Sequence, residues 1–101
     1  MLNNFKTYDL AEKLFRECRK IKTQAYIRDQ LMRAALSIVL NTQEGAAKAS
    51  EKDRKRFYNI AYASAKEVQA ILKLLDLHEQ FKLADQVGAC LFRLQHPKPE
   101  A

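Results

Sequence analysis

The sequence predicts an all-α fold, an up-down-up-down four-helix bundle, on three observations. The 101-residue chain holds only two glycines and two prolines, whereas a β-rich fold of this length needs many of the tight turns that these residues form. Apolar residues recur at helical spacing in four segments, at about residues 5–22, 24–46, 51–78 and 80–95. The connections between them are short, so consecutive helices should pack antiparallel in a single domain, residues 1–101.

The first expected helix, residues 5–22, is amphipathic. Its apolar stripe recurs at spacings of three and four and consists of Phe5, Tyr8, Ala11, Leu14, Phe15, Cys18 and Ile21. The opposite side carries a surplus of three positive charges. This helix should therefore bury one face and leave the other in water.

The second expected helix, residues 24–46, has three faces at about 100° per residue. The core-facing stripe holds Ile27, Leu31, Ala34, Ala35, Ile38 and Thr42, and a second, mostly apolar stripe holds Met32, Leu36, Val39 and Gln43. A polar stripe holds Gln30, Arg33, Ser37, Asn41 and Glu44. Because a helix that serves one small core needs a single apolar stripe, this helix has apolar surface left over for a further contact.

The third expected helix, residues 51–78, has a clear start. Gly45 should end the preceding helix, since glycine readily adopts the left-handed conformation found at helix C-termini. Ser50 offers an N-cap, and Glu51 and Asp53 suit the positive end of the helix dipole. The core seam of this helix is predicted at Phe57, Ala61, Ser64, Val68, Ile71, Leu75 and His78.

The fourth expected helix, residues 80–95, completes the bundle. Its inward side is predicted to hold Phe81, Ala84, Val87, Gly88, Leu91 and Leu94. Gly88 lowers the helix propensity and would allow a neighbouring helix to approach closely. The proline-rich end of the chain that follows should fray.

Several classes of protein are disfavoured by the same sequence. No apolar run approaches the roughly 20 residues that span a bilayer, and no secretory signal is present, so a cytoplasmic protein without a membrane partner is expected. Cys18 and Cys90 fit no metal or redox spacing, which favours buried free thiols over a disulfide. Glu44 and Glu67 lack the histidine three residues later that a di-iron bundle requires. With no nucleophile, metal or cofactor pattern, we expect a protein that is not an enzyme.

A basic face on the third helix is the strongest functional signal. The chain has a net charge of +6, which suits an acidic partner without identifying one. The candidate nucleic-acid-binding residues are Lys52, Arg54, Lys55, Arg56, Tyr58, Tyr62, Lys66 and Lys73, with Asn59 and Gln69 beside them. Lysines can neutralise backbone phosphates, and tyrosine rings can stack on unpaired bases of RNA or DNA. An ordinary solvated face, with both tyrosines packed on a neighbouring helix or subunit, fits the pattern equally well.

The segment Gln30–Gly45 also carries a recognisable family pattern. With Ser50, Phe57, Ala61 and the run Ser64–Glu67, it resembles the bacterial four-helix-bundle proteins encoded within intervening sequences of large-subunit ribosomal RNA genes. The same superfamily includes the accessory variability proteins of diversity-generating retroelements. The residues that carry the resemblance are Arg33, Ala34, Ala35, Ser37, Ile38, Asn41, Glu44 and Gly45, together with Ser64 and Glu67.

The resemblance implies an assembly and a partner. Proteins of this kind are expected to form barrel-like homopentamers with a nucleic-acid-binding surface, and in the retroelement branch to bind a reverse transcriptase. Met32, Leu36 and Val39 are then the expected subunit contact, because a protomer in a ring buries two faces. The family pattern Asn-Ile-Ala-Glu-Gly is replaced here by Asn-Thr-Gln-Glu-Gly at residues 41–45. The choice between a ribosomal-RNA-associated protein and a retroelement accessory protein stays open, as does a purely protein-binding scaffold.

Overall fold

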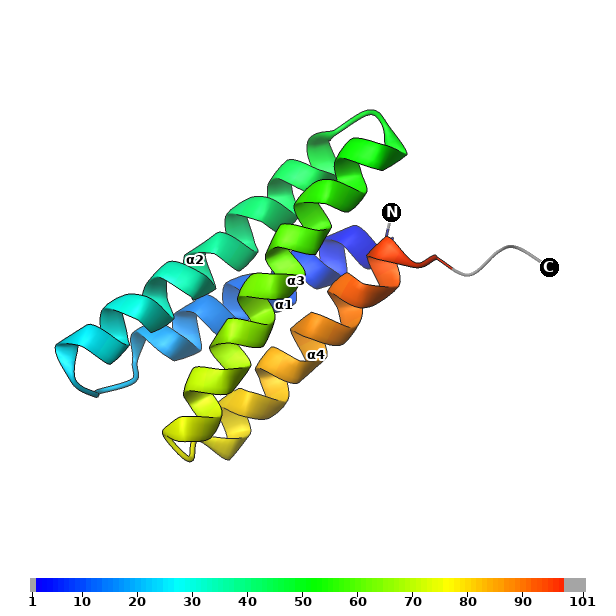
Figure 1. Ribbon diagram of the computed structural model, residues 1–101. Helices are drawn as coiled ribbons and strands as arrows, with labels where there is room; N and C mark the ends of the chain where they lie inside the picture. Colours follow the sequence, from blue (N-terminus) through cyan, green and yellow to red (C-terminus); the bar gives the residue numbers. More distant parts are fainter. Residues whose placement is uncertain (1, 98–101) are drawn as a thin grey trace.

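Four antiparallel helices form the molecule in a computed structural model, which describes residues 2–97 (Figure 1). They are α1 (Leu2–Arg19), α2 (Ala25–Ala47), α3 (Glu51–Leu74) and α4 (His78–Gln95). Helix α1 packs against α2 and α4, and α3 packs against the same two helices. The helices therefore surround one core, and the all-α four-helix bundle predicted from the sequence is confirmed.

The α1–α2 connection is fastened by an arginine. Helix α1 ends at Arg19, earlier than the sequence pattern suggested, although Ile21 beyond it is still buried. The guanidinium of Arg28 donates to the Ile21 carbonyl at 2.8 Å and to the Arg19 carbonyl at 3.2 Å. These bonds satisfy carbonyl groups that a helix end leaves without intrahelical partners, so the apolar stripe can continue after the helix has stopped.

Helix α3 begins after the α2–α3 connection at Glu51, where the sequence predicts its start. The Ser50 hydroxyl accepts from the backbone N–H of Asp53 at 3.1 Å, which confirms the N-cap. The Arg54 guanidinium donates to the carbonyls of Lys48 and Ala49 at 3.1 and 2.7 Å. This side chain therefore fixes the connection from within the first turn of α3.

Two further helix ends differ from the prediction. Helix α2 continues to Ala47, and Gly45 lies inside it without a positive φ. Helix α3 ends at Leu74, because Asp76 adopts a left-handed conformation with φ of 57° and the Leu77 N–H turns back to the Leu72 carbonyl at 3.0 Å. His78 is consequently the exposed first residue of α4 and does not extend the seam of α3.

The buried row of α3 keeps Ala61 and Val68 of the predicted seam and is shifted by one residue at other positions. It consists of Tyr58, Ala61, Ala65, Val68, Gln69 and Leu72. The predicted seam positions Phe57, Ser64 and Ile71 are only partly buried. Because α3 packs against both α2 and α4, its buried arc is wider than a single seam and its centre lies between the two neighbours.

The two cysteines are free and buried, as predicted. Burial raises the pKa of the Cys18 thiol to about 12, with a smaller contribution from the charge of Glu17. Cys18 is therefore a protonated core side chain at neutral pH. Within residues 2–97, no helix is long and apolar enough to cross a membrane.

Candidate nucleic-acid interface

A row of positive side chains follows the exposed side of α3. This α3 cationic row consists of Lys52, Lys55, Arg56, Lys66 and Lys73, all of which are exposed. From Lys52 to Lys73 it is about 31 Å long, for a helical rise of about 1.5 Å per residue. Helix α3 carries six basic and three acidic residues, so it supplies half of the net charge of +6.

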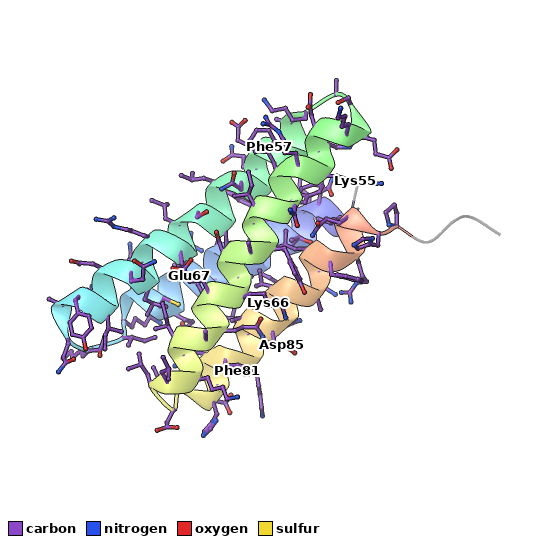
Figure 2. All side chains as sticks on the ribbon, in the orientation of Figure 1. Lys55, Phe57, Lys66, Glu67, Phe81 and Asp85 are labelled. Atoms are coloured by element: carbon purple, nitrogen blue, oxygen red, sulfur yellow. The ribbon has the colours of Figure 1, made fainter. Side chains whose placement is uncertain are left out.

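The cations of the row are only weakly engaged with other groups. The Lys55 amine lies 3.2 Å from a carboxylate oxygen of Glu51 in an exposed pair on the same helix, an interaction worth little in water. The Lys66 amine lies 5.3 Å from the centre of the Tyr62 ring. Glu67, the nearest acid in sequence to Lys66, lies about 100° further around α3, on the side toward α2, where its carboxylate accepts from the Gln30 amide (Figure 2). The row can therefore meet an anion without first breaking a buried ion pair.

Two residues predicted for this face serve the fold instead. Tyr58 is 3% exposed, and its hydroxyl donates to Asn4 Oδ1 at 3.2 Å. Tyr58 therefore does not lie on the exposed face. For this residue the alternative interpretation, packing on a neighbouring helix, is the correct one. Arg54 is held by the α2–α3 connection, as described above. Gln69, which was expected beside this face, is also buried, so the predicted face is reduced to the lysines, Arg56, Asn59 and the partly buried Tyr62.

Gly45 makes room for the Tyr58 ring. A Cβ atom at position 45 would lie 2.6 Å from Tyr58 Cε1 and 2.7 Å from Cδ1, closer than side-chain carbon atoms approach one another. The Tyr58 ring therefore lies directly on the backbone of α2. Any residue larger than glycine at position 45 would keep the ring further from that backbone. Burial raises the pKa of the Tyr58 hydroxyl, an effect that the nearby Arg54 charge partly opposes.

The family-pattern residues of α2 and α3 join these two helices. The Ser37 and Ser64 hydroxyl oxygens lie 2.8 Å apart. The Asn41 amide donates to the Ser37 carbonyl at 2.9 Å and to its hydroxyl at 3.1 Å. The Gln30 amide donates to a carboxylate oxygen of Glu67. Four family-pattern residues, Ser37, Asn41, Ser64 and Glu67, are thus members of one polar seam between α2 and α3.

Two further family-pattern residues lie outside that seam. Arg33 and Glu44 are exposed, and Glu44 pairs with Lys48 at 3.2 Å. Because Glu67 binds Gln30 near the start of α2 while Glu44 lies near its end, the two carboxylates do not form a pair. The arrangement accordingly offers no paired carboxylic acids for acid–base chemistry.

The second apolar stripe of α2 is divided between the core and the surface. Met32 and Val39 are partly buried against the core, whereas Leu36 is 44% exposed. Leu40, one turn after Leu36 and outside the predicted stripe, is 51% exposed. On α1, Phe5 is 69% exposed and lines a groove of about 470 Å³ with Gln43, Ala46 and Ala47 of α2. We call the exposed residues Phe5, Leu36 and Leu40 the α1–α2 apolar face.

An exposed aromatic pair near the end of α4 was also missed. Phe92 is 49% exposed, and its ring centre lies 4.3 Å from that of His96. The Phe92 ring centre also lies 6.1 Å from that of Tyr62 on α3. The signal was available, since Phe92 is an aromatic residue outside the apolar stripe of an amphipathic helix, and such a residue has no place in the core.

The fold and this surface place the chain in the class of small, basic four-helix-bundle proteins. Residues 2–97 include no cluster of three side chains that could hold a metal ion. Within that class, the model of the 23S rRNA-intervening sequence protein family matches residues 4–82. The chain belongs to this family. The match covers α1, α2, α3 and the first turn of α4. Comparisons with curated proteins and with solved structures find no match.

Proposed function

We propose that this protein is a non-enzymatic nucleic-acid-binding protein that contacts RNA or DNA through the α3 cationic row. The observation that supports the proposal is the row itself, five exposed cations along one side of a helix whose acidic neighbour Glu67 is turned toward α2. Exposed lysines neutralise phosphates and release bound counterions, which gives affinity without sequence preference. The surface therefore suits contacts with the nucleic-acid backbone.

The proposal is tested by removing three cations from the row. In a Lys55→Gln, Lys66→Gln and Lys73→Gln variant, we expect the slope of log affinity against log salt to fall by about 3, since each phosphate contact contributes about 1. Fluorescence polarisation with labelled RNA and DNA oligonucleotides over a salt series measures that slope. A Lys13→Gln, Lys22→Gln and Lys82→Gln variant is the control, because it removes the same charge from exposed positions off α3. Equal slopes in the two variants would contradict the proposal.

We further propose that the protein assembles into a homopentamer through the α1–α2 apolar face, with Met32, Leu36 and Val39 at or beside the contact. Leu36 and Leu40 are large apolar side chains left in water by the monomer, and contiguous exposed apolar surface marks association sites. A ring would bring five copies of the α3 cationic row into one particle. Light scattering after gel filtration tests this, with a Leu36→Glu and Leu40→Glu variant expected to elute as the 11.7 kDa monomer.

The same exposed face favours a second role, that of a protein-binding scaffold. In the retroelement setting the proposed partner is a reverse transcriptase, and in the ribosomal-RNA setting no such enzyme is involved. A purified protein that binds no oligonucleotide at low salt but retains a co-expressed reverse transcriptase would select the scaffold. The neighbouring genes distinguish the two settings. A reverse-transcriptase gene beside the reading frame would indicate the retroelement, and an rRNA gene around the reading frame would indicate the ribosomal-RNA setting.

A further inference from the structure

The exposed aromatic pair of α4 lies beside the α3 cationic row. Phe92 contacts Tyr62, and Tyr62 lies under the Lys66 amine at 5.3 Å. Because α3 and α4 run antiparallel, the part of α3 that precedes Tyr62 runs alongside the end of α4 (Figure 1). Lys55 lies on that part of α3 (Figure 2). Rings and cations thus share one edge of the bundle.

The rings on this edge differ in what they can offer a ligand. The Lys66 amine lies over the Tyr62 ring, and the Phe92 ring is tilted against it at 51°, so Tyr62 is already in contact with two neighbouring side chains. Phe92 and His96 are both exposed, and their centres lie 4.3 Å apart at an interplanar angle of 39°. This separation is short enough for two rings to form the start of a stack, which a further planar group can extend.

The charges on this edge favour an anionic ligand. Among residues 2–97, the Lys66 amine has no carboxylate within ion-pair distance, and Lys55 pairs only with the exposed Glu51. On α4, Asp85 is the acid of this row, and its Oδ1 accepts from the Gln69 amide at 3.0 Å. The positions one and two turns further toward Phe92 and His96 are Ala89 and Arg93, which are not acidic. A protein partner would find only one large apolar side chain here, Phe92, whereas the α1–α2 apolar face offers three. Planar groups linked by phosphates match both the rings and the cations.

We propose that Phe92 and His96 form a stacking site for unpaired bases of single-stranded RNA or DNA, with Lys66 and Lys55 holding the adjoining phosphates. The inference deepens the nucleic-acid-binding function proposed above and rests on it. Every base presents a π-face, so stacking adds affinity without fixing a sequence. In a duplex those faces are covered by neighbouring base pairs, and only the cationic row could be used. The site therefore selects single strands at a surface that would otherwise bind either form.

The test separates bases from phosphates. Fluorescein-labelled (dT)12 is compared with an abasic 12-mer that has the same backbone charge, both by fluorescence polarisation at one low salt concentration. We expect wild-type protein to bind (dT)12 about tenfold more tightly than the abasic strand, from stacking of one or two bases. In a Phe92→Leu and His96→Asn variant this difference should vanish while the affinity for the abasic strand is kept. Leucine preserves the apolar contact with Tyr62, so the bundle should remain folded.

A Tyr26→Leu variant is the matched control, because it removes another exposed aromatic ring, 73% exposed, at the start of α2. It should retain the tenfold difference. Equal binding of (dT)12 and the abasic strand by wild-type protein would overturn the stacking site and leave the proposed function standing. Absence of binding to either strand would overturn both.

A second measurement locates the contact in unmodified protein. A 12-mer of 5-iodo-deoxyuridine is crosslinked to wild-type protein by ultraviolet light, and the modified peptide is identified by mass spectrometry. We expect the adducts on Phe92, His96 or Tyr62. Adducts confined to other parts of the chain would overturn the site even if the double variant failed to fold.

Discussion

The two sides of α3 are built differently. Toward α2, small and polar residues fit closely, with the Ser37–Ser64 hydroxyl contact at 2.8 Å and the Tyr58 ring laid on Gly45. Toward α4 the fit is looser. Gln69 is buried and donates to Asp85 Oδ1 at 3.0 Å, but within residues 2–97 its own Oε1 atom has no hydrogen-bond partner. A Cβ atom built at Gly88 would meet only that oxygen, at an ordinary 3.6 Å, and Ala65 Cβ at 4.0 Å.

The two sides of α3 also differ in how far the family match reaches. The α2–α3 seam lies wholly within the matched residues 4–82, whereas most of α4, including Phe92 and His96, lies outside them. Tight seams tolerate little change, because interiors are close-packed and strain is transmitted. The α3–α4 interface is less closely packed, so we expect substitutions there to be tolerated better than in the α2–α3 seam.

The largest expected effect in the α2–α3 seam comes from filling the space under Tyr58. A Gly45→Ala substitution places a methyl group where the ring now lies, and overpacking of this kind costs about 1–3 kcal/mol. Urea unfolding followed by circular dichroism measures the change in the free energy of unfolding. Combining it with Tyr58→Leu should recover part of the loss, since the flexible side chain can move aside. A Gly45→Ala protein as stable as wild type would show that the seam is not tight.

A smaller effect is expected from the hydroxyl pair of the same seam. Ser37→Ala alone should lower the free energy of unfolding by about 1 kcal/mol, because the Ser64 hydroxyl loses its partner while partly buried. The Ser37→Ala and Ser64→Ala double variant should lose less than the sum of the two single variants. A double-mutant cycle measures the coupling. Strictly additive losses would mean that the 2.8 Å contact contributes no pairwise stabilisation.

The smallest effect should have the opposite sign and lies in the α3–α4 interface. Gly88→Ala should raise the free energy of unfolding by about 0.5–1 kcal/mol, because alanine restricts the unfolded chain and the built methyl group has room. Thermal unfolding detects this as a higher midpoint temperature. Gly45→Ala and Gly88→Ala can therefore be compared directly. If both changed the free energy of unfolding in the same direction, the two interfaces of α3 would not differ in how closely they pack.

The periodicity of the sequence was enough to predict the number of helices and their packing, because each helix has to bury one face. It did not fix the rotation of α3. Phe57 and Tyr58 are adjacent, both are aromatic, and local spacing permits either one to face the core. Their positions are decided by Gly45, which lies on another helix and leaves space for only one ring. The position of the buried row depends on this contact between Tyr58 and Gly45 of another helix. Spacing within α3 alone could not show the contact, and Tyr58 was therefore predicted to lie on the surface.

The surface was predictable where it depended on charge alone. Lysines such as Lys66 and Lys73 lie opposite any core and were placed on the exposed side of α3 from spacing. Phe92 and His96 were overlooked for a different reason. Their proximity to Tyr62 and Lys66 depends on the register between α3 and α4, which the early end of α3 at Leu74 sets. Sequence spacing within one helix contains no information on that register.

The circular order of the helices has a kinetic consequence. Each helix touches the ones before and after it in the chain, so most of the contacts join nearby segments, a topology associated with folding in microseconds to milliseconds. The α1–α4 contact is different, because it brings together the two ends of the described chain. Closing that long loop costs the most entropy, so docking of α1 on α4 should come late. The start of α1 and the end of α4 lie at the same end of the bundle (Figure 1), and a nascent chain would complete its fold only when α4 has been made.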